Sequence, residues 1–221
     1  MAWDAVWEDI FKSKAWGKYP AEELVIFVAR NFYKASPRGA VKILEVGCGP
    51  GGNLWFMARE GFTVYGVDGS ETAIRQTKQR LDNECPGWKG ELVVGDIQRL
   101  PFKDGFFDAV IDNNAVCCNS YETSKAIYSE TARVVKKDGK LFSRMMATGC
   151  WGDGTGQNVG HRAWIVSEGP LTGTGYVRFT DLSEVSDLVR GFNILNVESL
   201  VVTSGNRENT FKEWIIFGER A

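Results

Sequence analysis

The sequence predicts an α/β protein with a doubly wound, mostly parallel seven-stranded sheet that ends in a C-terminal antiparallel hairpin. From residue 41 to residue 190, short apolar runs of strand length alternate with segments of helical periodicity. That alternation is typical of a parallel sheet covered by helices. Two final apolar runs, 192–203 and 210–218, are separated by six residues. So short a connection indicates neighbouring antiparallel strands.

Two helices are expected before the sheet. Apolar residues at helical spacing predict one over residues 3–12, and Pro20 suits the first turn of another that ends near Tyr33. Ser70 is expected to cap a later helix. The other expected elements are strands 41–46, 62–68, 91–95, 107–112 and 139–146, and helices 52–60, 70–83, 122–136 and 181–190.

At 221 residues the chain fits one domain, residues 1–221. Within it, residues 1–38 are expected to form an N-terminal helical lid. Residues 147–178 interrupt the alternation and contain eight glycines. We expect a long, Gly-rich loop there on the substrate side, since loops of this length in a compact domain are often functional.

Charge and cysteine content narrow the functional classes. The net charge is −2, from 26 basic and 28 acidic residues, and no run of Lys or Arg stands out, which disfavours a nucleic-acid partner. Five cysteines without a Cys-x-x-Cys pair argue against disulfides and structural zinc, so no metal is expected. With no secretion signal and no apolar segment of about 20 residues, we expect a cytoplasmic protein without a membrane partner. Nothing in the sequence specifies an oligomeric state.

The most informative segment is the glycine-rich turn at residues 45–53, Glu-Val-Gly-Cys-Gly-Pro-Gly-Gly-Asn, which joins a strand to a helix. Glycines let bare N–H groups at a helix N-terminus approach an anionic or nucleoside ligand closely. Gly47, Gly49 and Gly52 fit the pattern G-x-G-x-x-G, and Asp68 ends the next strand. Taken alone, this pattern favours a nicotinamide or flavin enzyme.

Three further features favour a different nucleoside. Glu45 directly precedes the glycines, where an acid would repel a pyrophosphate but suits an ammonium group. Asp96 ends the following strand, where a carboxylate can accept a hydrogen bond from an adenine amine. The C-terminal hairpin stands in place of further parallel strands. Together these features describe an adenosine with an amino-acid tail, as in S-adenosylmethionine (SAM).

From residue 41 to residue 217 the chain resembles the class I SAM-dependent methyltransferases of the small-molecule type, which implies their Rossmann-like fold. The resemblance depends on five segments in the right order. They are EVGCGPG at 45–51, GVDGS at 66–70, GDIQRLPF at 95–102, FFDAV at 106–110 and RVVKKDGKL at 133–141. In the last segment Lys137-Asp138 stands where Pro-Gly is commoner in the family.

The resemblance implies roles for the residues around the glycine turn. The backbone at Gly47, Gly49 and Gly51 would lie against the methionine part of SAM. Glu45 would support the turn and attract the amino group through water. Asp68, followed by Gly69, would accept hydrogen bonds from both ribose hydroxyls.

On the adenine side, the resemblance implies that Asp96 holds the exocyclic amine. The N–H of Ile97 would bond an adenine ring nitrogen, and its side chain would pack on the ring. Asn113, just past the fourth strand, would offer a backbone carbonyl to the methionine ammonium and begin the acceptor pocket.

The expected acceptor is a small molecule that is methylated on oxygen or nitrogen by direct displacement. No Asn-Pro-Pro-Tyr, Asp-Pro-Pro-Tyr or Pro-Cys follows the fourth strand, which disfavours base methylation of DNA. His161, the one histidine, is the candidate base for a hydroxyl acceptor, and a surface histidine is the competing interpretation. The expected substrate-side residues are Trp16, Tyr19, Asn114, Cys117 and Trp151.

Three alternatives stay open. A nicotinamide-dependent oxidoreductase would bind NADH in place of SAM. A non-catalytic SAM-binding protein would retain S-adenosylhomocysteine (SAH) without turnover. An aminopropyl transferase of similar fold is less supported, because no separate acidic polyamine pocket is evident.

Overall fold

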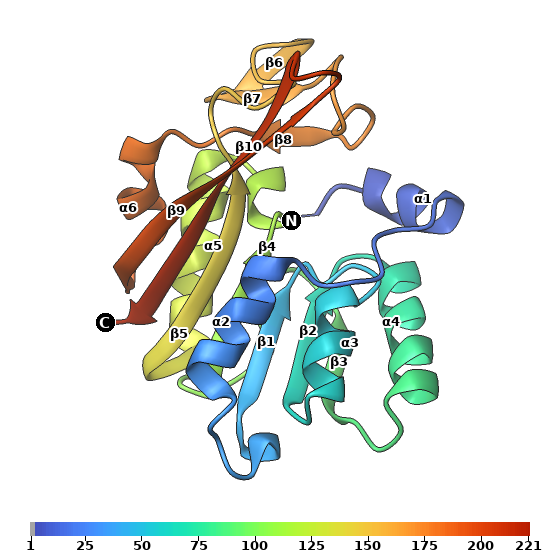
Figure 1. Cartoon of the computed structure of the whole chain (residues 1–221), viewed down its shortest axis with the longest axis vertical. Helices are drawn as coiled ribbons and strands as arrows, with labels where there is room; N and C mark the ends of the chain where they lie inside the picture. The colour runs from blue at the N-terminus through green and yellow to red at the C-terminus, as the bar shows by residue number, and fades with distance from the viewer. Residues whose placement is uncertain (1–2) are drawn as a thin grey trace.

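A seven-stranded mixed sheet forms the centre of the computed structural model, which describes residues 3–221 (Figure 1). The strand order is β3-β2-β1-β4-β5-β10-β9, and the fold class predicted from the sequence is confirmed. Strands β1 to β5 pair in parallel, whereas β10 is antiparallel to both β5 and β9. The strands are β1 Lys42–Val46, β2 Thr63–Asp68, β3 Lys89–Val94, β4 Phe107–Asn113, β5 Val135–Met146, β9 Phe192–Ser204 and β10 Asn209–Arg220.

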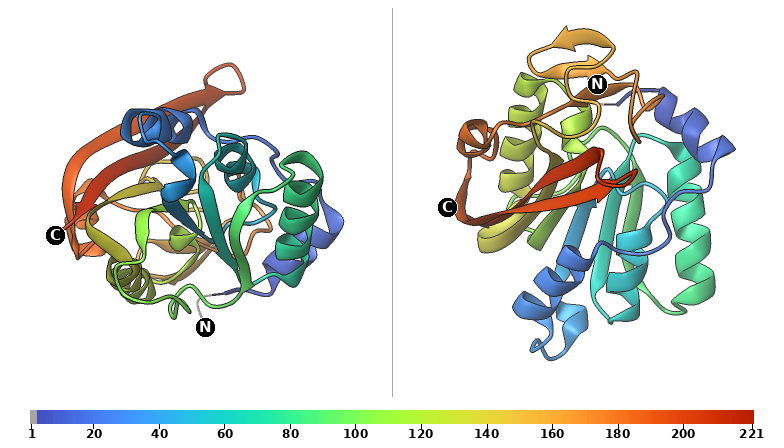
Figure 2. Two further views of the ribbon diagram at one scale, coloured as in Figure 1. Left: turned by 90° about the horizontal axis from the view of Figure 1, so that it is seen from below. Right: turned by 45° about the horizontal axis from the view of Figure 1, so that its top comes forward.

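Helices cover both faces of this sheet, as the view from below shows (Figure 2). Apolar side chains of α2 and α3 pack on one face, and those of α5 and α6 pack on the other. The helices are α1 Val6–Ser13, α2 Glu22–Phe32, α3 Gly52–Arg59, α4 Glu71–Glu84, α5 Tyr121–Val134 and α6 Val185–Leu188. Short 3-10 turns are η1 Arg38–Ala40, η2 Val116–Cys118 and η3 Leu182–Glu184.

The central strands are buried on both faces, which explains their unbroken apolar character. In β1, Leu44 and Val46 belong to one core cluster and Ile43 to the other. Ser70 caps α4 as predicted, because its hydroxyl accepts a hydrogen bond from the Ala73 N–H at 3.0 Å. The cap fixes the start of the helix that follows β2.

The insertion at residues 147–178 is not the loop expected from the sequence. It contains a three-stranded antiparallel sheet of β6 Gln157–Gly160, β7 Ala163–Ile165 and β8 Tyr176–Arg178, above the main sheet in Figure 1. Strands of three or four residues between glycines show no clear two-residue period, so the sequence pattern did not reveal them.

Three predicted helices differ in their boundaries. The helix expected over 3–12 is α1 Val6–Ser13, so Trp3 precedes it. The helix expected over 122–136 ends at Val134, and β5 begins at Val135 instead of residue 139. Asp138 has a φ of +62°, and the pairing of β5 with β4 shifts near this point, so an irregularity hides the strand start. The helix expected over 181–190 is only η3 followed by the short α6.

None of the helices in residues 3–221 has the length and apolar character required to cross a bilayer. Within the same residues, no group of three or more His, Cys, Asp or Glu side chains is arranged to hold a metal ion.

Candidate active site

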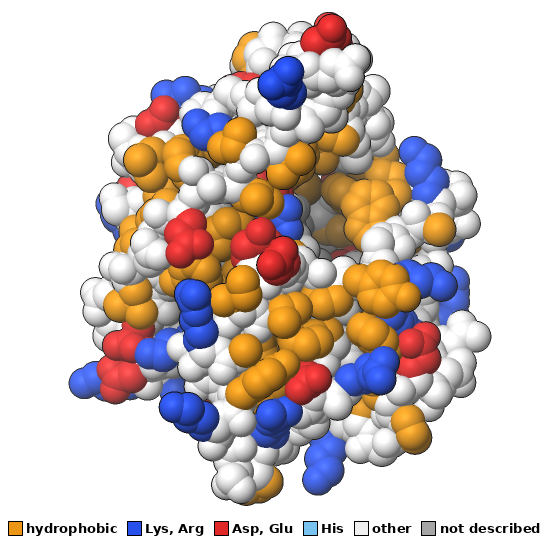
Figure 3. Space-filling view, in the orientation of Figure 1, with side chains coloured by type: hydrophobic (Ala, Val, Ile, Leu, Met, Phe, Trp, Pro, Cys, Tyr) orange, Lys and Arg blue, Asp and Glu red, His pale blue; other side chains and the backbone are white. Residues whose placement is uncertain are grey.

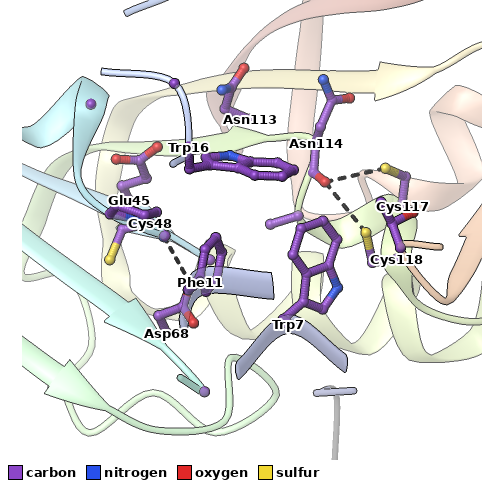
Figure 4. A pocket seen from close by; sticks show the side chains of 18 of the residues that line it. Trp7, Phe11, Trp16, Glu45, Cys48, Asp68, Asn113, Asn114, Cys117 and Cys118 are labelled. Atoms are coloured by element: carbon purple, nitrogen blue, oxygen red, sulfur yellow. Dashed lines mark hydrogen bonds between the residues drawn. The ribbon is translucent and has the colours of Figure 1, made fainter. Parts of the chain in front are cut away.

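A cavity of about 360 Å³ lies at the carboxyl ends of β1, β2 and β4 and opens on the face shown in Figure 3. Open α/β sheets bind ligands at this edge. Among the predicted site residues, the cavity is lined by Trp16, Tyr19, Glu45, Gly47, Gly49, Gly51, Asp68, Gly69, Ile97, Asn113, Asn114 and Cys117. The structure therefore brings together most of the residues that the sequence analysis singled out (Figure 4).

The glycine turn packs too tightly for side chains. Gly47 has a φ of +63°, and a Cβ there would lie 2.2 Å from the Cβ of Ala115, just beyond β4. Gly51 has a φ of +75°, and a Cβ there would lie 2.5 Å from Thr77 on α4. Both positions need glycine for backbone conformation and for space. The turn is thereby held close to β4 and α4.

Asp68 fixes the turn from the end of β2. Its Oδ2 accepts the Gly49 N–H and its Oδ1 accepts the Ser70 N–H, each at 2.8 Å. Burial raises the pKa of this carboxyl above its usual range. Each carboxylate oxygen has two acceptor sites, so one remains on each oxygen for a ligand. Two hydroxyls of a ribose match that arrangement.

Glu45 is a buried acid whose second oxygen lacks a protein partner. The Asn53 Nδ2 donates to Oε1 at 2.6 Å, while Oε2 is sealed from solvent and has no hydrogen-bond partner among residues 3–221. Burial raises the pKa of Glu45 to about 8. A buried carboxylate without a counter-charge is costly. An ammonium group at the glycine turn would supply the missing charge and donor, so these residues fit the amino-acid tail of SAM.

The adenine side is formed by Gly69, Gly95 and Ile97, which line the cavity beyond β2 and β3. The Trp3 ring lies on Gly69 so closely that a Cβ there would be 2.1 Å from it. Asp96 is not among the lining residues, and its Oδ1 accepts the Gln98 N–H at 2.9 Å. The structure thus brings Ile97, but not the Asp96 carboxyl, to the cavity wall.

A buried carboxylate fixes the segment after β4. Asp112 accepts hydrogen bonds from the Tyr128 hydroxyl at 2.6 Å and the Ser143 hydroxyl at 2.8 Å. It also accepts the N–H groups of Ala115 and Val116, each at 3.1 Å. Burial raises the pKa of Asp112. Its role in the structure is to hold the chain at the start of η2.

Two asparagines follow Asp112 at the cavity wall. Asn114 has a φ of +61°, and its Nδ2 donates to the buried Glu213 at 2.6 Å. The Oδ1 atoms of Asn113 and Asn114 are both buried and lack a hydrogen-bond partner within the described chain. Unpaired amide oxygens and a left-handed backbone beside a cavity are features found at ligand sites.

The wall beyond these asparagines is apolar. Cys117 and Cys118 both direct their thiols to the Asn114 carbonyl oxygen, at 3.5 and 3.6 Å (Figure 4). The contact with Cys117 and burial raise the pKa of Cys118, which keeps it a neutral thiol. The side chains that complete this acceptor half are Met146, Leu171, Val177 and Phe211.

The N-terminal segment forms a roof over the cavity, which we define as Trp3, Trp7, Phe11 and Trp16. The Trp7, Phe11 and Trp16 ring centroids lie 5.4–5.7 Å apart, and Phe11 rests on Gly49. Sequence analysis assigned the first three roof residues only to the apolar face of a helix. Their aromatic type was the available signal that this face covers a ligand.

Glu8 attaches the roof to the start of α4. Its carboxylate accepts hydrogen bonds from the Ser70 hydroxyl, from the Thr72 hydroxyl at 2.6 Å and from the Thr72 N–H at 3.2 Å. The bond from Ser70 is the largest of the causes that lower the pKa of Glu8 to about 2. A carboxylate at a helix N-terminus is also favoured by the helix dipole.

The structure does not bring Trp151 or His161 to the cavity. His161 is exposed, and its Nε2 lies 2.5 Å from Oε1 of Glu184. The Trp151 ring packs on Gly169, and the backbone N–H of Trp151 donates to the Thr210 carbonyl at 2.7 Å. The small sheet of the insertion places the turn between β6 and β7, with His161, away from the cavity lining.

Residues 43–139, from β1 into β5, match the family model of the methyltransferase domain. This part of the chain is therefore similar to the SAM-dependent methyltransferase domain. The matched residues include the glycine turn and the acid at the end of β2. SAM is the cofactor of the family, and the Glu45 and Asp68 geometry fits it.

Known relatives share this domain over part of their length. The chain is 31% identical over 125 residues to a malonyl-[acyl-carrier protein] O-methyltransferase of Legionella pneumophila, covering 53% of this chain and 39% of the relative. It is 36% identical over 100 residues to a fatty-acid O-methyltransferase of Mycolicibacterium smegmatis, covering 44% of this chain and 34% of the relative. The matches therefore span well under half of each relative.

A solved structure agrees over nearly the whole chain. The protein described as converting a disulfide bond into a thioacetal group during echinomycin biosynthesis superposes with a TM-score of 0.71 at 16% identity. The superposition covers 98% of this chain and 91% of the other. At this identity the likeness concerns the fold.

Proposed function

We propose that this chain transfers the methyl group of SAM to an oxygen or nitrogen atom of a small, largely apolar acceptor. The observation that carries the proposal is the composition of one continuous cavity. One half presents Glu45 and Asp68 over the glycine turn, and the other half is walled by Met146, Leu171 and Phe211. A polar cofactor half next to an apolar half matches what this transfer requires.

In this proposal the polar half binds and orients the cofactor. The acceptor sites left on Asp68 receive the ribose hydroxyls, and the unpaired Oε2 of Glu45 faces the ammonium group. When bound, SAM would supply a methyl group on a positively charged sulfur: the acceptor atom bonds to the methyl carbon as the carbon–sulfur bond breaks, and the sulfur leaves as the neutral thioether of SAH. Alignment of the two reactants can account for about 7–11 kcal/mol of the barrier.

The roof and the insertion exclude water from the reacting groups. Phe11 and Trp16 cover the glycine turn, and Leu171 and Val177 of the insertion close the acceptor half. Removing water strengthens every electrostatic contact inside the cavity. Positioning and exclusion of water are the contributions that the chain makes to the transfer.

Asp4 replaces His161 as the candidate to accept a proton. It lines the acceptor half of the cavity, and its Oδ1 accepts the Val6 N–H at 3.0 Å. The negative charge of Asp4 is one of the causes that raise the pKa of the Cys118 thiol. A hydroxyl or amine acceptor would need such a base, whereas an ionised carboxylate acceptor would not.

The relatives support an acceptor with an acyl chain. Their names describe O-methylation of malonyl-[acyl-carrier protein] and of fatty acids, and the apolar acceptor half suits such chains. This support concerns acceptor chemistry only, since each relative is matched over part of its length.

A transfer assay with methyl-labelled SAM tests the proposal. The acceptor panel contains apolar carboxylic acids, alcohols and amines, and both labelled product and SAH are measured. We expect transfer to at least one acceptor class by the natural chain and strongly reduced transfer by Asp68→Asn. Tight SAH retention without transfer to any class would favour a non-catalytic SAM-binding protein. Binding of NADH but not SAM would favour an oxidoreductase.

A further inference from the structure

The segment between α1 and α2 exposes aromatic rings at the mouth of the cavity. We call Lys14-Ala15-Trp16-Gly17-Lys18-Tyr19 the entrance segment. Trp16 is 43% exposed and Tyr19 is 74% exposed, although both also line the cavity. Tryptophan and tyrosine are the side chains enriched where an apolar phase meets water.

The entrance segment is basic in a chain that is acidic overall. Residues 10–21 contain Lys12, Lys14 and Lys18 and no Asp or Glu, whereas the net charge of the chain is −2. Lys14 and Lys18 are exposed, and neither forms an ion pair within the described residues. Both ammonium groups are therefore available to an external anion.

Contacts with α3 and α4 hold the entrance segment in place. The Arg80 guanidinium donates to the Lys18 carbonyl at 2.5 Å and lies 4.3 Å from the centre of the Trp55 ring. The same Trp55 ring meets the Tyr19 ring edge-on, with 5.8 Å between centroids. The exposed rings are thus presented by a supported segment.

The tip of the β9–β10 hairpin adds a second apolar edge to the mouth. Val201 and Val202 are 53% and 50% exposed; Val202 pairs with Phe211, which lines the cavity, and Val201 lies on the other face of the hairpin tip. Figure 3 shows hydrophobic side chains around the hollow, Lys and Arg side chains to its right, and Asp and Glu side chains at its lower left. Two segments far apart in the sequence therefore border one opening.

We propose that the entrance segment and the Val201–Val202 edge dock on an anionic lipid surface, from which the apolar acceptor enters the cavity. The proposal rests on the proposed function, because it supplies the route for the acceptor. A lipid surface fits better than an acidic carrier protein, since exposed rings and valines gain from entering the headgroup boundary as well as from charge. It departs from the sequence expectation of no membrane partner, because exposure at the mouth could not be read from sequence.

Vesicle sedimentation of the full chain tests the charge contribution. The vesicles contain phosphatidylcholine alone, or phosphatidylcholine with about one third phosphatidylglycerol. Each surface lysine contributes about 1 kcal/mol, so the double variant Lys14→Gln and Lys18→Gln should bind anionic vesicles about 30-fold more weakly. Lys89→Gln with Lys137→Gln is the matched control, because both lysines are exposed near the opposite, amino-terminal edge of the sheet. This control should bind like the natural chain.

A second pair of variants tests the apolar contribution. Val201→Ser with Val202→Ser should weaken binding, whereas Leu195→Ser should not, although Leu195 is 61% exposed on the same strand. Leu195 lies about 20 Å along the strand from Val202. Calorimetric binding of SAH by each variant confirms that it is folded.

Absence of sedimentation with anionic vesicles, or equal loss in the test and control variants, overturns the proposal. Binding to a purified acidic acyl carrier protein but to no vesicle also overturns it. The assay contains no acceptor and requires no turnover. A negative result in sedimentation therefore does not count against methyl transfer, which the labelled-SAM assay tests separately.

Discussion

Replacing Glu45 by glutamine should stabilise the ligand-free protein and weaken cofactor binding at the same time. Burial raises the pKa of Glu45 from the ordinary value of 4.5 to about 8. Glutamine has nearly the same shape, and its amide oxygen can still accept the Asn53 hydrogen bond that Oε1 now receives. The substitution thus removes the titrating group and little else.

The direction of this pH dependence follows from the number of protons that the folded and unfolded states bind. Between pH 4.5 and about 8 the unfolded chain has an ionised Glu45 while the folded chain keeps it protonated. The free energy of unfolding therefore falls as pH rises through this window, by about 1.4 kcal/mol for each pH unit. At pH 8 and above, the natural chain has lost about 5 kcal/mol of unfolding free energy. The Glu45→Gln variant has no titrating group at this position and keeps that stability.

Denaturant unfolding without ligand, at several values between pH 5 and pH 9, measures this difference. Glu45→Gln and the natural chain should differ little at pH 5, and the advantage of the variant should grow to about 5 kcal/mol at pH 8. Asp68 and Asp112 have raised pKa values in both proteins, so their contributions largely cancel. Glu208→Gln, on the exposed hairpin turn, is the control and should show a flat difference.

Calorimetry with SAM supplies the second readout. Loss of a charge-assisted hydrogen bond to the ammonium group costs about 1.5–3 kcal/mol, which corresponds to about 10- to 100-fold weaker binding. A difference in unfolding free energy that does not change with pH would refute the burial argument. Undiminished SAM affinity would refute the assignment of Glu45 to the ammonium group.

Three further predictions concern other parts of the site. Asp68→Asn should weaken SAH binding about 10- to 100-fold by calorimetry, because one carboxylate oxygen becomes an N–H donor that faces a backbone N–H. Gly51→Ala should lower the unfolding free energy about 1–3 kcal/mol more than Gly61→Ala, since both have positive φ but only Gly51 lacks space for a Cβ. His161→Ala should leave turnover unchanged in the transfer assay, because His161 lies outside the cavity lining, and a large loss would restore it as a base.

Regular alternation made the main sheet predictable. The strands around β1 are buried on both faces and so appear as short apolar runs, and the hairpin of β9 and β10 follows from a six-residue connection. The glycine turn could also be predicted, because Gly47 and Gly51 occupy conformations and spaces that exclude other residues. These features depend on residues that are close together in the sequence, so a sequence pattern can reveal them.

Features decided by distant contacts were not predictable. The roof depends on how α1 crosses the ends of the strands, and nothing in Trp7 or Phe11 alone separates a ring that covers a ligand from a core residue. His161 attracted attention as the one histidine, but its position depends on the small sheet of the insertion. His161 was predicted to be the base from its residue type, whereas a base must also lie at the cavity.

Ser70 connects the roof to Asp68, the acid at the end of β2. Its N–H donates to Asp68 at 2.8 Å, and its hydroxyl donates to Glu8 on α1. If a ligand that contacts Asp68 stabilises the docked position of α1, then by thermodynamic reciprocity an appendage that displaces α1 must weaken binding of that ligand by the same factor. Affinity tags fused ahead of α1 would therefore bias measured cofactor constants in this protein more than tags placed after β10.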